Sequence, residues 1–264
     1  MKSGIVMFKH SLLLICVSFI CFLCCGQQKS LTVGQFTKEI FTNRIQEKLP
    51  YRLLYPKGYD SNKSYPVILF LHGAGSQGDD NESHLNEVPL VLQNAASGEK
   101  QACFVLAPQC AKDDAWVWFP QYPLCLTAKD PSKASRLTLE LIDLLAGKLK
   151  IDRTRIYVTG LSLGGEGAFD IITRRPHFFA AAVPVCGIAD TSKVDLMKST
   201  PLWIFHGDSD DVNSVEYSRN LVKVMKKHGG SPIYTEYKGV EHDSWTKAYQ
   251  EPELLNWMFK QHLD

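Results

Sequence analysis

Short apolar runs separated by helical periods constrain the fold of this chain more than any other feature of its sequence. Five such runs lie at residues 66–71, 102–107, 155–159, 180–185 and 201–205. Runs of this kind suit strands that are buried on both faces of a parallel sheet. A sixth run, at 233–237, alternates more between apolar and polar residues and is expected near an edge of the sheet.

Helical periods fill the segments between these runs. Apolar residues recur at steps of three and four between 137 and 149, between 217 and 225, and between 254 and 259. Strands that alternate with amphipathic helices predict an α/β fold with helices on both faces of the sheet. Ligands of such sheets bind outside the carboxyl ends of the strands, so the polar residues that follow each strand are the candidates for function.

The N-terminus has the features of a secretory signal peptide. Lys2 and Lys9 precede an apolar run at 11–23, and small and polar residues follow. A signal peptide at 1–26 predicts a secreted or periplasmic protein. Three fates of this segment are possible: cleavage after Gly26, lipidation at Cys24 or Cys25, or retention as a membrane anchor. A membrane partner is expected only with lipidation.

The length of 264 residues suits one catalytic domain plus a short leader. A polar arm is predicted at 27–50 and a catalytic domain at 51–264, beginning with a strand at 51–55. The formal charge of +1 and the lack of a basic stripe argue against a nucleic-acid partner. Within the predicted domain neither a CxxC pair nor a histidine-rich spacing is present, and no metal or cofactor is expected.

Four cysteines belong to the predicted domain: Cys103, Cys110, Cys125 and Cys186. Export would permit disulfides. Cys110 and Cys125 lie in a loop-like segment and are the predicted pair, whereas Cys186 lies in an apolar run and is expected to stay a buried thiol.

The sequence Gly160-Leu161-Ser162-Leu163-Gly164-Gly165 directly follows the strand predicted at 155–159. It fits the G-x-S-x-G nucleophile elbow, a sharp strand-to-helix turn that exposes a serine hydroxyl. The helix predicted from Leu163 toward Arg174 points its positive end at this serine. The alternative is a glycine-rich turn with a spectator serine.

Two later loops supply a base and an acid. His242 follows the last predicted strand, and Asp208, Asp210 and Asp211 follow the strand at 201–205. The order serine, acid, histidine is that of α/β-hydrolases, with His242 as general base. Asp210 is the predicted acid because its loop can turn back toward His242. Asp208 is expected to be a turn residue, and Asp211 is the alternative acid.

The loop after the first central strand is the predicted second half of an oxyanion hole. The backbone N–H of Leu163 would give one donor, and that of Ala74 the other. His72 is expected to anchor this loop, and His206 to be a packed structural histidine.

Aromatic residues predict the walls of a substrate site. Trp116 and Trp118 lie in a loop that follows a strand, and Trp245 is close to His242. These rings suit stacking on sugars or phenolic acyl groups; the alternative is that they cover a loop core. No long apolar lid is present, which argues against a lipase.

Four stretches together, 69–75, 160–165, 205–210 and 239–242, resemble the small single-domain α/β-hydrolases of the dienelactone-hydrolase, carboxylesterase and phospholipase-like group. This group includes secreted feruloyl and acetyl esterases and the catalytic domains of prolyl-oligopeptidase relatives. The resemblance implies an α/β-hydrolase fold with a mostly parallel central sheet, the acid role of Asp210 and the loop amide of Ala74. Ser162 departs from the cysteine nucleophile of dienelactone hydrolase, and the chain has no room for the large gating domain of prolyl oligopeptidases.

The function expected from these residues is that of a serine carboxylic-ester hydrolase working through an acyl-enzyme. Its expected substrate is a small-molecule or polysaccharide-linked ester with a short-chain or aryl acyl group, such as acetyl or feruloyl. A serine peptidase of the prolyl-oligopeptidase type is the alternative, with Glu166 as its only hint. A binding protein on an inactive scaffold would require a broken triad.

Overall fold

The computed structural model describes Met1 and residues 36–98, 101–121 and 123–264. The predicted signal peptide, its cleavage after Gly26 and the lipidation at Cys24 or Cys25 lie outside the described residues. No helix in the described ranges combines the length and the apolar character needed to span a bilayer.

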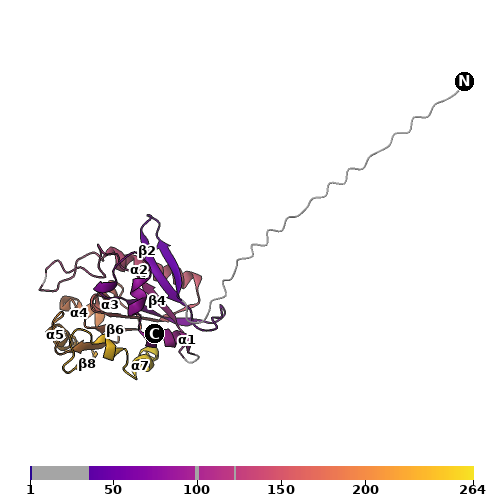
Figure 1. Cartoon of the computed structure of the whole chain (residues 1–264). Helices are drawn as coiled ribbons and strands as arrows, with labels where there is room; N and C mark the ends of the chain where they lie inside the picture. Colours follow the sequence, from indigo (N-terminus) through magenta and orange to yellow (C-terminus); the bar gives the residue numbers. More distant parts are fainter. Residues whose placement is uncertain (2–35, 99–100, 122) are drawn as a thin grey trace. The chain divides into compact units, whose positions relative to one another are not determined.

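The central feature is an eight-stranded sheet with the strand order β1-β2-β4-β3-β5-β6-β7-β8. Figure 1 labels β2, β4, β6 and β8 of this sheet. The strands are β1 (Thr37–Thr42), β2 (Lys48–Leu54), β3 (Tyr65–Leu71), β4 (Phe104–Pro108), β5 (Ile151–Leu161), β6 (Ala181–Val185), β7 (Trp203–Gly207) and β8 (Ile233–Tyr237). β2 pairs antiparallel with β1 and β4, and all other pairs are parallel. The prediction of a mostly parallel sheet is confirmed.

Two apolar cores lie on opposite faces of this sheet, because successive side chains of a strand point to opposite sides. Along β3, Leu69 and Leu71 belong to one core and Ile68 and Phe70 to the other. The first core is covered by α2 (Lys133–Lys148), α3 (Leu163–Arg174), α4 (Val194–Met197) and α5 (Glu216–Lys227). The second is covered by α1 (Leu90–Ser97), α6 (Trp245–Ala248) and α7 (Leu254–Lys260).

The sheet begins earlier in the chain than the sequence predicted. Residues 37–42 and 48–50, assigned to a polar arm, form β1 and the first part of β2. β1 buries only Phe41 among its six residues, so its sequence lacks the apolar run that marked the central strands. The edge hairpin was therefore not visible from hydrophobic pattern alone.

The predicted disulfide between Cys110 and Cys125 is wrong. All four cysteines of the described domain are free and buried. Cys110 packs in the core next to α2, and the Cys125 thiol donates to the carbonyl of Pro123 at 3.2 Å. Cys186 is a buried thiol, as predicted, and burial raises its pKa to about 12.

Candidate active site

Ser162 lies in a sharp turn between β5 and α3. Its backbone has φ 52° and ψ −119°, a conformation that non-glycine residues rarely adopt. The Ser162 N–H donates to the carbonyl of Val185 at 3.0 Å, and the Ser162 carbonyl accepts from the N–H of Glu166 at 2.9 Å. Strand and helix thus hold the turn from both sides and present the hydroxyl at the carboxyl edge of the sheet.

Glycines allow this turn because other backbone lies against it. A Cβ on Gly164 would lie 1.9 Å from the carbonyl oxygen of Leu71, and one on Gly160 would lie 2.3 Å from the carbonyl oxygen of Gly164. Only glycine fits at these two positions. The close packing sets α3 directly against the end of β3, where the predicted oxyanion loop begins.

The structure brings Ser162, His242 and Asp210 into one hydrogen-bonded line. His242 Nε2 lies 2.8 Å from Ser162 Oγ, and His242 Nδ1 lies 2.9 Å and 3.0 Å from the two carboxylate oxygens of Asp210. With Nδ1–H donating to Asp210, Nε2 is left to accept the serine proton. This is the geometry of a nucleophile, its base and the group that orients the base.

The other two candidate acids lie elsewhere. The Asp208 carboxylate accepts from the N–H of Gly239 at 2.6 Å and from the hydroxyl of Ser209 at 2.9 Å, which makes it the predicted turn residue. Asp211 is exposed. Of the three aspartates, Asp210 alone contacts His242 within the described residues.

His206 is fully buried, as predicted, and it also contacts the acid of the triad. Its Nε2 lies 3.1 Å from Asp210 Oδ2 and 2.8 Å from the carbonyl of Asn213, while Nδ1 lies 2.7 Å from Ser218 Oγ. Burial lowers the pKa of His206, so the neutral ring carries its proton on Nε2 and accepts from the Ser218 hydroxyl. The sequence offered only one sign of this support, a histidine four residues before Asp210.

The predicted oxyanion loop is anchored by two buried contacts. His72 Nδ1–H donates to the carbonyl of Gly73 at 2.7 Å, and its Nε2 accepts from the N–H of Cys110 at 2.9 Å. Burial lowers the pKa of His72, which keeps the ring neutral, as these two contacts require. Glu87 accepts from the N–H of Gly73 at 2.6 Å, a contact that no sequence motif marked.

The two predicted amide donors lie at the starts of helical segments. Leu163 is the first residue of α3, and Ala74 begins the 3₁₀ turn η1 (Ala74–Ser76). The first N–H groups of a helix have no partner within it and suit an anion. Because Gly164 packs against Leu71, both segments lie at the same edge of the sheet.

The three predicted tryptophan walls have different environments. Trp116 is only 1% exposed and donates from Nε1 to the carbonyl of His72 at 2.9 Å, so it braces the oxyanion loop and its prediction as a substrate wall is wrong. The half-buried ring of Trp245 stands 5.4 Å from the His242 ring, at 89° to it. Trp118 is 46% exposed and borders a separate pocket.

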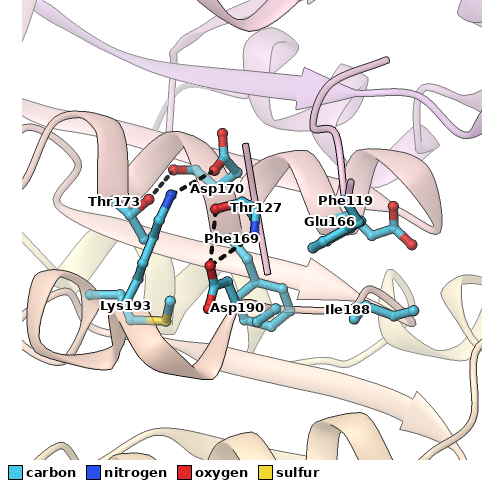
Figure 2. A pocket seen from close by; sticks show the side chains of 11 residues that line it. Phe119, Thr127, Glu166, Phe169, Asp170, Thr173, Ile188, Asp190 and Lys193 are labelled. Carbon is cyan, nitrogen blue, oxygen red and sulfur yellow. Dashed lines mark hydrogen bonds and ion pairs between the residues drawn. The ribbon is translucent and has the colours of Figure 1, made fainter. Parts of the chain in front are cut away.

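Glu166 lies one turn along α3 from the elbow, at the end of a small pocket (Figure 2). In Figure 2 it stands with Phe119 and Ile188, away from Asp170 and Lys193. Asn213 Nδ2 donates weakly to its carboxyl at 3.4 Å, and burial raises the pKa of Glu166 to about 7. The group is therefore partly protonated near neutral pH.

Asp190 and Arg174 fasten the loop that carries Phe119. Asp190 accepts from the N–H and hydroxyl of Thr127 at 2.9 Å and 3.1 Å, as Figure 2 shows. Arg174 donates to the carbonyls of Ala128 and Lys129 at 2.7 Å and 2.5 Å. The base of this loop is thus bound to α3 and to the segment after β6.

One group of possible metal ligands occurs among the described residues. Atoms of Cys186, Asp210 and His242 lie within 4.8 Å of one another. The raised pKa of Cys186 keeps its thiol protonated, and the thiolate is the form that binds metals. His242 and Asp210 are already bonded to each other, so this group belongs to the Ser162 site.

Comparisons with known proteins give an independent view of the same chain. Residues 42–254 match the model of the family Esterase, whose description reads "Putative esterase". The chain is 29% identical to "Probable feruloyl esterase C" from Aspergillus terreus over 164 residues. This matched region is 62% of this chain and 52% of that protein. The chain spans about half or less of the length of the curated relatives that it matches.

Solved structures share the fold. One described as a thermostable esterase has a TM-score of 0.78 and 36% identity, over 87% of this chain and 64% of the other. A ferulic acid esterase from Anaeromyces mucronatus, in complex with ferulic acid, has a TM-score of 0.58 and 17% identity, over 89% and 93% of the two chains. The predicted α/β-hydrolase fold is confirmed.

Proposed function

Because the chain belongs to the Esterase family, we propose that it is a serine hydrolase that cleaves carboxylic esters through an acyl-enzyme. One observation carries the proposal. The Ser162 hydroxyl, the His242 imidazole and the buried Asp210 carboxylate form an unbroken line of hydrogen bonds of 2.8–3.0 Å.

These three hydrogen-bonded residues can carry out the acylation step. His242 Nε2 takes the proton of Ser162 as Oγ bonds to the ester carbonyl carbon, and the carbonyl oxygen becomes an oxyanion. Asp210 stabilises the imidazolium that forms and holds its orientation. His242 then gives the proton to the alcohol oxygen as the ester C–O bond breaks, which leaves the acyl group on Ser162.

Deacylation repeats these steps with water. His242 removes a proton from a water molecule, whose oxygen attacks the acyl carbon, and the proton passes to Ser162 Oγ as the carboxylic acid leaves. The N–H groups of Leu163 and Ala74 are the proposed donors to both oxyanions. One such donor is worth on the order of 10²–10³ in turnover.

The proposed substrates are esters with a short-chain or aryl acyl group, including acetyl or feruloyl groups on polysaccharides. The name of the Aspergillus relative supports a feruloyl group, and the ring of Trp245 beside His242 offers an aromatic surface for it. Export, proposed from the sequence of the leader alone, would place the enzyme with such polymers.

Turnover of p-nitrophenyl acetate by the wild-type chain and by Ser162→Ala and His242→Ala tests the reaction. We expect each variant to lose at least about 10³-fold in kcat while its circular dichroism spectrum is unchanged. A fluorophosphonate probe should label the wild type but not Ser162→Ala.

A prolyl-anilide substrate, assayed beside the ester, separates the esterase from a peptidase. Faster turnover of the anilide would replace the ester proposal by a peptidase. Full ester turnover by either variant would end the proposed mechanism.

A further inference from the structure

A second pocket lies at the same edge of the sheet as Ser162, beyond the oxyanion loop. It follows the end of β4 and reaches the beginnings of β2 and α2. The order of the sheet places β4 two strands from β5, which is about 10 Å at the usual spacing of strands. None of Ser162, His242 and Asp210 borders it.

Gln77 links this pocket to the oxyanion loop. It follows η1, which Ala74 begins, and its Nε2 donates to the carbonyl of Ala111 at 3.3 Å and also bonds to that of Asp114. Both Ala111 and Asp114 border the pocket. Gln77 therefore connects the segment that lines the pocket to the loop of the proposed oxyanion hole.

The pocket has the size and the lining of a site for a small organic group. Its volume is about 330 Å³, and small-molecule sites usually span about 300–1,000 Å³. Leu49 and Leu137, which are almost fully buried, are among its lining residues. The ring of Trp118 borders the pocket at 46% exposure, an unusual position for so large an apolar side chain.

Hydrogen-bonding groups line the same pocket as this exposed ring. Lys48, Asp113 and Lys133 are exposed members of the lining, and none of them forms an ion pair within the described residues. The Trp118 indole N–H likewise has no hydrogen-bond partner there. An aromatic face with free donors and an acceptor around it suits a ligand with one apolar face and a rim of hydroxyls.

We propose that this pocket is a subsite for the sugar chain of a polysaccharide substrate, with Trp118 as its stacking surface. Lys48 and Lys133 balance Asp113 and Asp114 in charge, so the lining favours a neutral sugar chain over an acidic one. Its role as a subsite rests on the proposed esterase function, because a polymer held there would carry its ester groups toward Ser162.

Direct binding tests the pocket without relying on turnover. Xylohexaose is titrated by calorimetry into Ser162→Ala and into the double variant Ser162→Ala/Trp118→Ala. We expect Trp118→Ala to weaken binding about tenfold through loss of ring stacking, and Trp118→Phe to restore most of it. Leu124→Ala is the control, because Leu124 is 71% exposed and does not border the pocket.

Kinetics connect the pocket to the substrate. The ratio of kcat/KM on acetylated xylan to kcat/KM on p-nitrophenyl acetate should fall about tenfold in Trp118→Ala, mainly through KM. The same ratio should stay at the wild-type value in Leu124→Ala.

Three results would overturn the subsite: no binding of xylohexaose by Ser162→Ala, equal binding with and without Trp118, or tighter binding of polygalacturonate than of xylohexaose. Failure of the esterase itself would appear separately, as no Ser162-dependent turnover of p-nitrophenyl acetate.

Discussion

The Asp210 carboxylate is held by more donors than its role toward His242 alone requires. The N–H groups of Val212 and Asn213 donate to Oδ1 at 2.9 Å and 2.8 Å, and His206 lies against Oδ2. The side chain is fully buried, so these contacts replace the water that an ionised carboxylate would otherwise bind. Asp210 is thereby fixed as an acceptor facing His242.

Replacing Asp210 by asparagine should test this assignment. An amide cannot stabilise the imidazolium and can select the wrong histidine tautomer, so we expect kcat on p-nitrophenyl acetate to fall by about 10³–10⁴ in Asp210→Asn. Asp211→Asn, at the exposed neighbouring position, should lose less than about threefold. The reverse ranking would assign the acid to Asp211.

The sequence motifs identify the reacting residues and the loop anchor His72, but they do not mark the other residues that support the site. Ser162 and His242 stand in short motifs with a fixed relation to a strand end. Glu87 and Asn213 act through contacts between loops, and a single sequence carries no sign of such contacts. Trp116 was misplaced for a related reason, since an aromatic loop residue has the same pattern whether it faces a ligand or a core.

The contact between α3 and β3 determines where the elbow and the oxyanion loop meet. Gly164 lies so close to the carbonyl of Leu71 that no side chain fits between them. Glycine normally weakens a helix by roughly 0.5–1 kcal/mol relative to alanine. At this position the close approach of the two elements outweighs that cost.

Substitutions of two helical glycines separate these effects. Gly164→Ala should destabilise the fold by about 3 kcal/mol or more, because the added methyl forces α3 away from β3. The methyl group added by Gly147→Ala in α2 would meet open space, so this substitution should stabilise the fold by about 0.5–1 kcal/mol. Urea unfolding measures both changes, and a gain of stability in Gly164→Ala would contradict the close packing of α3 on β3.

The central elements were predictable because their burial appears directly in the sequence. The run at 233–237 coincides with β8, and the run at 180–185 contains β6. α3 occupies Leu163–Arg174, as the elbow motif implied. β1 was missed because an edge strand with one buried residue has no periodic pattern to detect.

Buried titratable groups should make the stability of the whole molecule depend on pH in two opposite ways. Burial lowers the pKa values of His72, His84 and His206, that of His84 to about 4. Below about pH 6.5 the unfolded chain binds protons that the folded chain does not, so the free energy of unfolding falls as the pH falls. Glu166 acts in the other direction, because its pKa is raised from 4.5 to about 7.

Glu166→Gln should reveal that second effect. Between pH 4.5 and 7 the folded chain keeps a proton on Glu166 that the unfolded chain has released, so stability is lost as the pH rises through this range. We expect the variant to gain about 1–2 kcal/mol over the wild type at pH 8 compared with pH 5, allowing for partial access of water to the carboxyl. Urea unfolding at both pH values measures the gain.

The exposed carboxyl of Glu39 on β1 provides the control for this measurement. Glu39→Gln should show the same stability difference from the wild type at pH 5 and at pH 8. A pH-independent effect of Glu166→Gln would mean that Glu166 is ionised in the folded chain across this range.

The buried free thiols give the molecule native reporters of its own opening. Cys103 and Cys186 lie in the core next to α1, α6 and α7, and Cys110 lies in the core on the opposite face. An alkylating reagent reaches such a sulfur only when the surrounding structure opens. The modification rates of Cys110 and of Cys103 and Cys186 therefore report how often the structure opens on each face of the sheet, without any label added to the chain.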